Sequence, residues 1–426
     1  MRNLAGAACL GLAAVGVVAA CPGPLVATPP GFAEFDRKAA AGEGLNVVFF
    51  GASLTWGANA SDPQLTSYRA LVGRRLEEAY PRARFKFWDA AIGGTGSQLG
   101  VFRLDRDVLR RRPDLVFLDF SANDDIGSAT PETLASYESL VRRILLDARA
   151  PVVPVIFPFQ WNVAQGNTAG MLRRDAHLAI AKAYHVPVGD AIQLALDRIK
   201  SGRTTLARLW PVDGVHPCDD GYELFADAAW DAFRQGVRDK LVCAPPEKML
   251  YASTYMKNAR VRLATLGALP AGWRVGKPSV VSAFFDMLMS RWLDDEAIAS
   301  NRPAGDANKE PPLSPPARLK VRFHGSMVML FGESTPESGK FRVYLDGKLV
   351  PRKSPDGKTS FDEFDAADFA RRVNGKAYLV QVLAEGLPPA AEHALEIEPV
   401  FAKDTPQELR LESICVAGGT AEVKVP

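Results

Sequence analysis

The sequence predicts an α/β domain with a parallel sheet, followed by a β-sandwich-like domain, and three observations lead to this prediction. From about residue 45, short apolar runs alternate with amphipathic helical stretches, which is typical of a parallel sheet covered by helices on both faces. Beyond residue 317, apolar and polar residues alternate along short runs, as they do in half-buried antiparallel strands. The length of 426 residues also exceeds what one ordinary hydrophobic core holds together.

The α/β domain is predicted over residues 42–242, with its first strand at residues 45–50. Apolar runs predict further strands at residues 84–91, 114–120 and 151–157. Amphipathic patterns predict helices at residues 67–80, 99–111, 131–148, 170–184 and 223–241. In such open sheets ligands bind beyond the carboxyl ends of the strands, so one face should hold the loops that begin at Gly51, Ile92, Ser121 and Phe157.

The second domain is predicted over residues 317–426 as a β-sandwich-like accessory domain. Alternating runs predict strands at residues 318–323, 327–331, 341–345, 378–383 and 408–415. The dipeptide Asp346-Gly347 is a hairpin signal. Residues 243–316 are predicted to connect the two domains, with a helical pattern at residues 283–292 and a polar, proline-rich linker at residues 300–316.

The N-terminus has the pattern of a secretory signal peptide, predicted at residues 1–21. The positive charge of Arg2 precedes an unbroken run of apolar and small residues up to Ala20. The run ends in Val18-Ala-Ala-Cys21, which offers a small-residue cleavage site and also resembles the lipobox of bacterial lipoproteins, so plain cleavage and lipidation of Cys21 both stay open. We expect an exported protein that is secreted, periplasmic or lipid-anchored, with no other membrane contact.

Composition excludes some partners and prosthetic groups. The net charge of +2 lacks the basic excess of nucleic-acid-binding proteins, so no nucleic-acid partner is expected. Cys218, Cys243 and Cys415 match no zinc spacing, and no metal site is expected. In an oxidising compartment Cys218 and Cys243 could form a disulfide, and two unpaired thiols fit the sequence equally well.

A candidate nucleophile, Ser53, lies in the motif Gly51-Ala-Ser-Leu-Thr-Trp-Gly57, directly after the first predicted strand. A sharp strand-to-helix turn at this point would expose the Ser53 hydroxyl at the edge of the sheet. A serine hydroxyl is a weak nucleophile until a positioned base takes its proton. The sequence must therefore also supply a histidine with an orienting carboxylate.

The motif Asp213-Gly-Val-His216 supplies that base and its orienter together. On this short, turn-rich loop Asp213 would hold the imidazole tautomer of His216, which would deprotonate Ser53 and later protonate the leaving alcohol. The remaining histidines fall in or after a helix or in the β-rich region and are expected at surface or core positions: His177, His185, His324 and His393.

Acyl transfer also needs hydrogen-bond donors aimed at the developing oxyanion. A glycine-rich segment follows the second predicted strand, and the backbone N–H of Gly94 is the expected donor there. Ser121-Ala-Asn-Asp124 follows the third predicted strand, and Asn123 can donate from its side-chain amide. With the backbone N–H of Ser53, these groups would form an oxyanion hole.

The order of these four segments is similar to blocks I, II, III and V of the SGNH (GDSL-like) hydrolase family, over about residues 45–240. The resemblance implies a flavodoxin-like three-layer α/β/α domain that needs no cofactor and hydrolyses acyl esters, including acetyl esters of carbohydrates. It also implies the same nucleophile, acid–base pair and oxyanion donors: Ser53, Asp213, His216, Gly94 and Asn123.

Four positions depart from the pattern of the family. Ala52 stands where an Asp is usual, Asp89 where an Asn is usual, Ser121 where Gly is common, and Cys218 where Asn is frequent. None of these changes removes a catalytic group. They concern the hydrogen bonds that stiffen the site, and therefore the rate and the substrate preference.

The amino-acid sequence resembles those of exported bacterial SGNH proteins that have an added β-rich module, of the kind found beside carbohydrate esterases. Such a module would contact polysaccharide or act as a spacer. Polar and aromatic side chains next to the motif loops are predicted to line a substrate pocket, as stacking surfaces for sugar rings or as polar contacts: Trp56, Gln160, Trp161 and Trp210. No long apolar lid is evident, which favours a short acyl group.

The predicted function is a serine esterase that removes short acyl groups, such as acetyl, from a small-molecule or polysaccharide substrate. An O-acyltransferase with the same triad and a non-catalytic carbohydrate-binding protein on the same fold are the alternatives. A dinucleotide-binding loop at residues 94–100 is excluded, because the required G-x-G-x-x-G spacing belongs on the first strand and this segment has one residue too many.

Overall fold

The structure is a computed structural model that describes residues 29–281, 283, 291–301, 315–354 and 357–424. The predicted signal peptide with Cys21 lies outside the described residues. So do most of the helical pattern at residues 283–292 and most of the linker at residues 300–316. Among the helices that are described, none is both long and apolar enough to cross a bilayer.

The N-terminal domain is built on five parallel strands in the order β2-β1-β3-β4-β5. This is the flavodoxin-like strand order, so the predicted fold class is confirmed. Strands β3 and β4 are buried at every residue, which explains their uninterrupted apolar sequences. The strand bounds are β1 (Gly44–Gly51), β2 (Arg84–Ala91), β3 (Leu115–Leu118), β4 (Val152–Ile156) and β5 (Gly189–Asp190).

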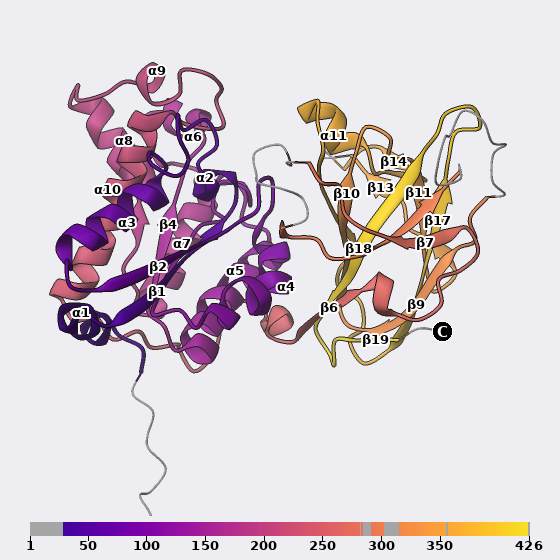
Figure 1. Cartoon of the computed structure of the whole chain (residues 1–426), viewed down its shortest axis with the longest axis horizontal. Coiled ribbons are helices and arrows are strands. Elements are labelled where there is room, and N and C mark those ends of the chain that lie inside the picture. Colours follow the sequence, from indigo (N-terminus) through magenta and orange to yellow (C-terminus); the bar gives the residue numbers. More distant parts are fainter. Residues whose placement is uncertain (1–28, 282, 284–290, 302–314, 355–356, 425–426) are drawn as a thin grey trace, which may run out of the picture.

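Helices cover both faces of this sheet (Figure 1). Their bounds are α1 (Phe32–Ala41), α2 (Ser53–Trp56), α3 (Tyr68–Ala79), α4 (Ser97–Asp107), α5 (Pro131–Arg143), α6 (Gln160–Ala164), α7 (Leu172–Ala183), α8 (Ala191–Lys200), α9 (Leu206–Leu209) and α10 (Asp219–Arg238). Helix α1 lies before residue 42, where we expected the domain to begin. It belongs to the domain because Phe32 and Phe35 are buried, with ring centroids 6.3 and 5.4 Å from that of Phe233 on α10.

The C-terminal domain is a sandwich of two antiparallel sheets, as predicted. One sheet has the order β16-β10-β18-β8-β7 with β6 beside β18, and the other has the order β12-β11-β17-β9-β19 with β15 beside β11. Apolar side chains from both sheets share one core. The bounds are β6 (Asn258–Arg262), β7 (Trp273–Gly276), β8 (Glu296–Ser300), β9 (Leu319–His324), β10 (Met327–Ser334), β11 (Lys340–Leu345), β12 (Lys348–Leu349), β15 (Phe364–Asp365), α11 (Asp368–Val373), β16 (Ala377–Ala384), β17 (Glu392–Val400), β18 (Glu408–Ala417) and β19 (Glu422–Lys424), with a separate hairpin of β13 (Arg352–Lys353) and β14 (Ser360–Phe361).

Two local features of this domain compare directly with the sequence. Asp346 and Gly347 both have positive φ, 51° and 76°, at the tight turn between β11 and β12, as the hairpin signal predicts. The region 243–316 differs from the expected connector, because β6, β7 and β8 are strands of the sandwich. Their pairing leads to β18, whose sequence lies more than 100 residues further along the chain, so no local pattern announces them.

The two domains pack directly against each other (Figure 1). The apolar core of the N-terminal domain continues into side chains of β10 and β18, including Met327, Phe331 and Cys415. Strand β10 is therefore buried at every residue, with the sandwich core on one face and the N-terminal domain on the other. This double burial explains why its sequence is a continuous apolar run at Met327–Phe331 instead of an alternating one.

Candidate active site

The structure brings together the three residues of the predicted triad. Ser53 is the first residue of α2, directly beyond the carboxyl end of β1, and is 3% exposed. The Nε2 atom of His216 lies 3.0 Å from the Oγ atom of Ser53. The Nδ1 atom of His216 lies 3.5 Å from the Oδ2 atom of Asp213. The imidazole thus stands between the hydroxyl and the carboxylate, the arrangement in which it can take the serine proton.

Asp213 is held by three further donors. Its Oδ1 atom accepts the backbone N–H groups of Val215 and His216, at 2.7 and 2.6 Å. Its Oδ2 atom accepts the side-chain amide of Asn59 at 2.7 Å. Sequence reasoning missed Asn59, although it follows the Ser53 motif closely and occupies the left-handed region at φ 65°, which Asn tolerates better than most residues.

These contacts set the charges of the pair. Burial lowers the pKa of His216 from its usual 6.5, and the Asp213 carboxylate opposes this effect only in part. Burial acts to raise the pKa of Asp213, but the N–H groups of His216 and Val215 and the amide of Asn59 together hold that pKa below its usual value. At neutral pH the pair therefore rests as a neutral imidazole beside a carboxylate, which is the form needed in a general base.

We expect kcat/KM for a small acetyl ester to have an acid limb with a midpoint below pH 6.5. Because the pKa of His216 is lowered, activity is full above that pKa and is lost as the pH falls through it. Acetate release from phenyl acetate, followed by pH-stat from about pH 4 to pH 8, measures this limb. In Asp213→Asn the midpoint should move further to the acid side, because the carboxylate that raises the pKa of His216 is gone. A wild-type midpoint above pH 6.5 would contradict the assignment of His216 as the base.

The predicted oxyanion donors lie around Ser53. Ser53, Gly94, Asn123, Asp213 and His216 all line one cavity. The backbone N–H of Ser53 is in the first turn of α2 and therefore has no acceptor within that helix. Gly94 has φ 72°, a conformation that favours glycine.

The loops that carry Gly94 and Asn123 are tied to each other behind the cavity. The Oδ1 atom of Asp124 accepts the backbone N–H of Ser97 at 3.0 Å. A Cβ atom on Gly96 would lie 2.3 Å from that same oxygen, so the close approach depends on glycine. Burial raises the pKa of Asp124 to about 6. The positive charge of Arg173 and the hydrogen bonds from Ser97 act in the opposite direction.

The departures from the family pattern have structural partners. Ser121 is buried, donates from Oγ to Asp119 at 3.1 Å and accepts the N–H of Phe157 at 2.9 Å, so it joins the ends of β3 and β4. Cys218 donates from Sγ to the carbonyl of Arg208 at 3.1 Å. Ala52 is a buried residue directly before α2. Asp89 pairs with Arg291, whose Nη1 atom lies 3.2 Å from its Oδ2 atom.

The cysteines in the described part of the chain are free thiols: Cys218, Cys243 and Cys415. The structure thus contains no bond between Cys218 and Cys243, the pairing that the sequence left open. Burial raises the pKa of the Cys243 thiol to about 12.

The cavity has a volume of about 690 Å³ and lies between the two domains. The N-terminal domain contributes the triad, the candidate oxyanion donors and Val215. The opposite wall comes from the C-terminal domain, around α11 and β16, and includes Asp365, Phe369, Arg372, Asn374, Tyr378 and Gln381. A Cβ atom on Gly94 would lie 2.9 Å from the ring of Phe369, so the second domain closes directly over the Gly94 loop.

The four residues predicted to line the substrate pocket lie elsewhere. Among the described residues that line the cavity, Trp56, Gln160, Trp161 and Trp210 do not occur. Trp210 is 3% exposed and packs in the core near Phe225. Gln160 and Trp161 lie beside Gly214 in the Asp213–His216 loop, and the Trp161 side chain is largely exposed. Sequence reasoning placed the wall on neighbouring loops, whereas the structure supplies it from residues more than 100 positions away.

Comparison with known proteins identifies the N-terminal domain. Residues 49–224 match the GDSL-like lipase/acylhydrolase family. A two-domain esterase (CEX) active on acetylated mannans is similar over 91% of this chain and 95% of its own, with a TM-score of 0.69 and 23% identity. Its structure co-crystallised with mannopentaose gives a TM-score of 0.71 and 22% identity over 92% of this chain and 97% of its own. Axe2, an acetylxylan esterase from Geobacillus stearothermophilus, covers 46% of this chain and 96% of its own, with a TM-score of 0.38 and 21% identity. Among curated proteins no match is found.

The family match spans every loop of the candidate site, from Ser53 to His216. The likeness to the two-domain esterase extends over both domains and therefore shows that they share the fold of that protein. Residues 49–224 of this chain therefore match the GDSL-like lipase/acylhydrolase family, within the fold of a two-domain esterase.

Proposed function

We propose that this protein removes acetyl groups from carbohydrate chains through an acyl-enzyme on Ser53. In this proposal His216 takes the Ser53 proton as the hydroxyl attacks the ester carbonyl, and Asp213 stabilises the imidazolium that forms. The N–H groups of Ser53 and Gly94 and the amide of Asn123 stabilise the oxyanion. His216 then gives its proton to the departing sugar oxygen. Water, deprotonated by His216, attacks the acyl-enzyme, and the tetrahedral intermediate breaks down to acetate as His216 returns the proton to the Oγ atom of Ser53.

The single observation that carries the proposal is the shared cavity. One hollow of about 690 Å³ contains Ser53, Gly94, Asn123, Asp213 and His216, with the Nε2 atom of His216 3.0 Å from the Ser53 hydroxyl. The nucleophile, the base and the candidate oxyanion donors therefore line one space, in which a single ester group could contact all of them. This is the geometric condition for acyl transfer.

The opposite wall of the cavity supports a carbohydrate as the leaving group. Aromatic rings lie there among amide, carboxylate and guanidinium groups, from Phe369, Tyr378, Asn374, Gln381, Asp365 and Arg372. Such a mixture suits a sugar, whose ring offers apolar faces and whose hydroxyls need hydrogen-bond partners. The two-domain esterase with the same fold is active on acetylated mannans, and this supports the same class of substrate here.

Release of acetate from acetylated mannan and acetylated xylan, beside hydrolysis of p-nitrophenyl acetate and octanoate, tests the proposal. We expect acetate from at least one polysaccharide and faster cleavage of the acetyl than of the octanoyl ester. Gln381→Ala should raise KM for the polysaccharide and change hydrolysis of p-nitrophenyl acetate little, because Gln381 lines the cavity from β16 of the C-terminal domain and is not among the triad or oxyanion residues. Preference for octanoate, or activity on aryl esters without deacetylation of any glycan, would contradict the proposal.

The proposal includes export, since polymeric glycans lie outside the cytoplasm. It rests on the apolar run up to Ala20, with lipidation at Cys21 as one of two routes. Mass spectrometry of the mature N-terminus from the native host distinguishes a lipidated Cys21 from a plain cleavage product.

A further inference from the structure

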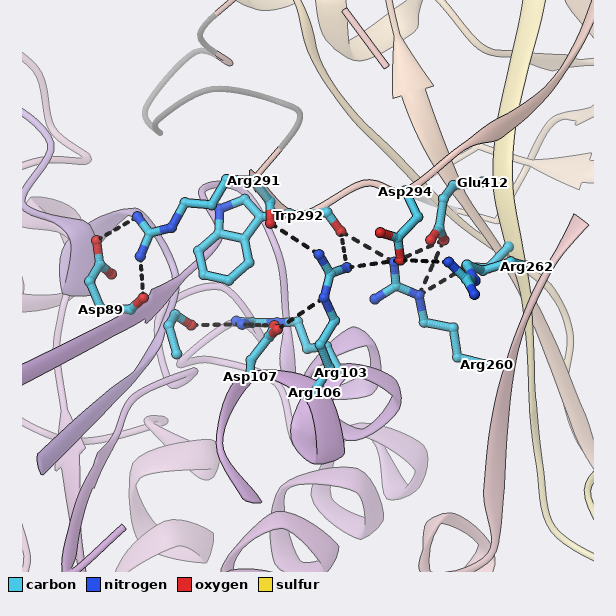
Figure 2. A network of polar contacts seen from close by, with 12 residues as sticks. Asp89, Arg103, Arg106, Asp107, Arg260, Arg262, Arg291, Trp292, Asp294 and Glu412 are labelled. Atoms are coloured by element: carbon cyan, nitrogen blue, oxygen red, sulfur yellow. Dashed lines mark hydrogen bonds and ion pairs between the residues drawn. The ribbon is translucent and has the colours of Figure 1, made fainter. Parts of the chain in front are cut away.

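A short segment between the two domains, Arg291–Asp294, is bound from both sides (Figure 2). Arg106 of α4 donates to the backbone carbonyls of Trp292 and Arg291, at 2.6 and 3.1 Å. Arg260 of β6 donates to the same Trp292 carbonyl at 3.3 Å. The Trp292 side chain is 5% exposed. The segment is thus fixed between α4 of the first domain and β6 of the second.

From this segment the Arg291 side chain reaches Asp89 at the end of β2 (Figure 2). Its Nη1 atom lies 3.2 Å from the Oδ2 atom of Asp89, and its Nη2 atom donates to the backbone carbonyl of Asp89. Arg69 flanks the same carboxylate at 3.6 Å, and the Asp89 side chain is 10% exposed. One guanidinium therefore contacts both the carboxylate and the main-chain carbonyl of Asp89 through two nitrogens of a rigid planar group, a geometry that the single nitrogen of lysine does not reproduce.

Asp89 stands directly before the loop that carries Gly94. Its Oδ1 atom accepts the backbone N–H of Ala91, the last residue of β2, at 3.0 Å, which fixes the strand end from which that loop starts. The N–H of Ile92 in turn bonds the carbonyl of Gly51 at 3.1 Å, two residues before Ser53. Asp89 therefore contacts the strand end that precedes Gly94, and the next residue, Ile92, connects this strand end to Gly51 in the Ser53 motif.

A second buried arginine ties the same strand ends together. Arg103 donates to the carbonyls of Ala90 and Gly51, at 2.6 and 2.7 Å, and is fully buried. Its guanidinium lies 4.4 Å from the ring centroid of Phe50 and 6.0 Å from that of Trp292. The interdomain segment therefore contacts the strand ends by two routes. Arg291 bonds Asp89 of β2, and Trp292 lies beside Arg103, which bonds the ends of both β1 and β2.

We propose that Arg291 is a positioning residue that holds the Gly94 loop in register for catalysis through Asp89, and the inference rests on the proposed function. It gives a reason for Asp at position 89, where the resemblance led us to expect Asn: a carboxylate completes a charged pair with Arg291 across the domain interface. The second domain thereby contributes to the rate on every ester, including those too small to touch its wall of the cavity.

The test compares variants on p-nitrophenyl acetate, with folded protein measured by circular dichroism and thermal melting. Arg291→Ala should lower kcat about tenfold with little change in KM, less than the about 10²- to 10³-fold loss expected when a whole oxyanion donor is removed. Arg291→Lys, which keeps the charge but not the two-point grip, should fall between wild type and Arg291→Ala. The matched control is Arg262→Ala, since Arg262 pairs with Asp294 of the same segment at 3.4 Å and is half exposed.

The inhibition constant of a boronic acid inhibitor does not depend on how much of the protein is folded. Its tetrahedral adduct with Ser53 places an oxygen at the oxyanion position, so the inhibition constant should rise in Arg291→Ala by about the same factor as kcat falls. Asp89→Asn should show the same direction, and the double variant should lose no more than Arg291→Ala, because the pair acts as a unit.

Unchanged kcat and inhibition constant in Arg291→Ala, or an equal loss in Arg262→Ala, would overturn the inference and leave the proposed function intact. An inactive wild type would overturn the proposed function instead. If Arg291→Ala melts early, Arg291→Lys and Asp89→Asn carry the same comparison, and wild-type values in both would overturn the inference.

Discussion

Replacing Ser53 with alanine is expected to lower kcat for acetyl ester hydrolysis by about 10⁴- to 10⁶-fold, as removal of the nucleophile does in other serine hydrolases with a triad. The reason is that the Ser53 hydroxyl stands 3.0 Å from the Nε2 atom of His216, and the candidate oxyanion donors line the same cavity. Water activated by His216 would leave only a small residual rate. Initial rates with p-nitrophenyl acetate at saturating substrate measure the loss.

The control for this variant is Ser201→Ala. Ser201 directly follows α8 and is exposed, and its hydroxyl bonds the carbonyls of Asp197 and Arg198 and the Arg203 side chain, so its removal should leave kcat within about twofold of wild type. A Ser53→Ala protein that is folded and retains more than a few per cent of wild-type kcat would show that another residue attacks the ester.

Replacing His216 with alanine is the second large expected effect, with a loss of kcat close to that of Ser53→Ala. The Ser53 hydroxyl then lacks its base, and the leaving alcohol lacks its proton donor. Since the two residues act in the same proton transfer, the double variant should be no less active than either single variant. Rates of the two single variants and the double variant on one ester measure this non-additivity.

His393→Ala serves as the matched control for the histidine. His393 also pairs with a carboxylate, with its Nδ1 atom 2.9 Å from the Oδ2 atom of Asp346, but it lies on β17 of the C-terminal domain. Its removal should leave kcat per folded molecule near the wild-type value. Additive losses in the Ser53 and His216 variants, or a comparable loss in His393→Ala, would contradict the proposed roles.

The parts of the site that could be predicted from the sequence are those whose residues lie close together in short motifs. Ser53 follows an apolar strand within a few residues, and Asp213 and His216 are three residues apart, so local spacing alone brings base and orienter together. The parallel sheet was predictable for the same reason, because β3 and β4 are buried on both faces and their sequences are continuously apolar.

The parts that sequence missed depend on contacts between distant residues. The wall around Phe369 meets Gly94 because the sandwich packs against the first domain, with β6 on α4, and nothing near residue 369 indicates this. Strands β6 and β8 were missed because their partner, β18, follows more than 100 residues later, and β7 joins the sheet through β8. Trp210 was expected at the pocket because it is a large aromatic beside a motif loop, but the same apolar surface buries it in the core.

The most direct test of the central claim is covalent labelling with diethyl p-nitrophenyl phosphate, followed by intact-mass and peptide analysis. The organophosphate reacts with an activated serine and releases nitrophenol, so the proposed site predicts one diethylphosphoryl group per chain, on Ser53, with loss of esterase activity in proportion. Ser53→Ala and His216→Ala should remain unlabelled under the same conditions. A label on another residue, or complete inactivation without modification of Ser53, would contradict the claim that Ser53 is the activated nucleophile.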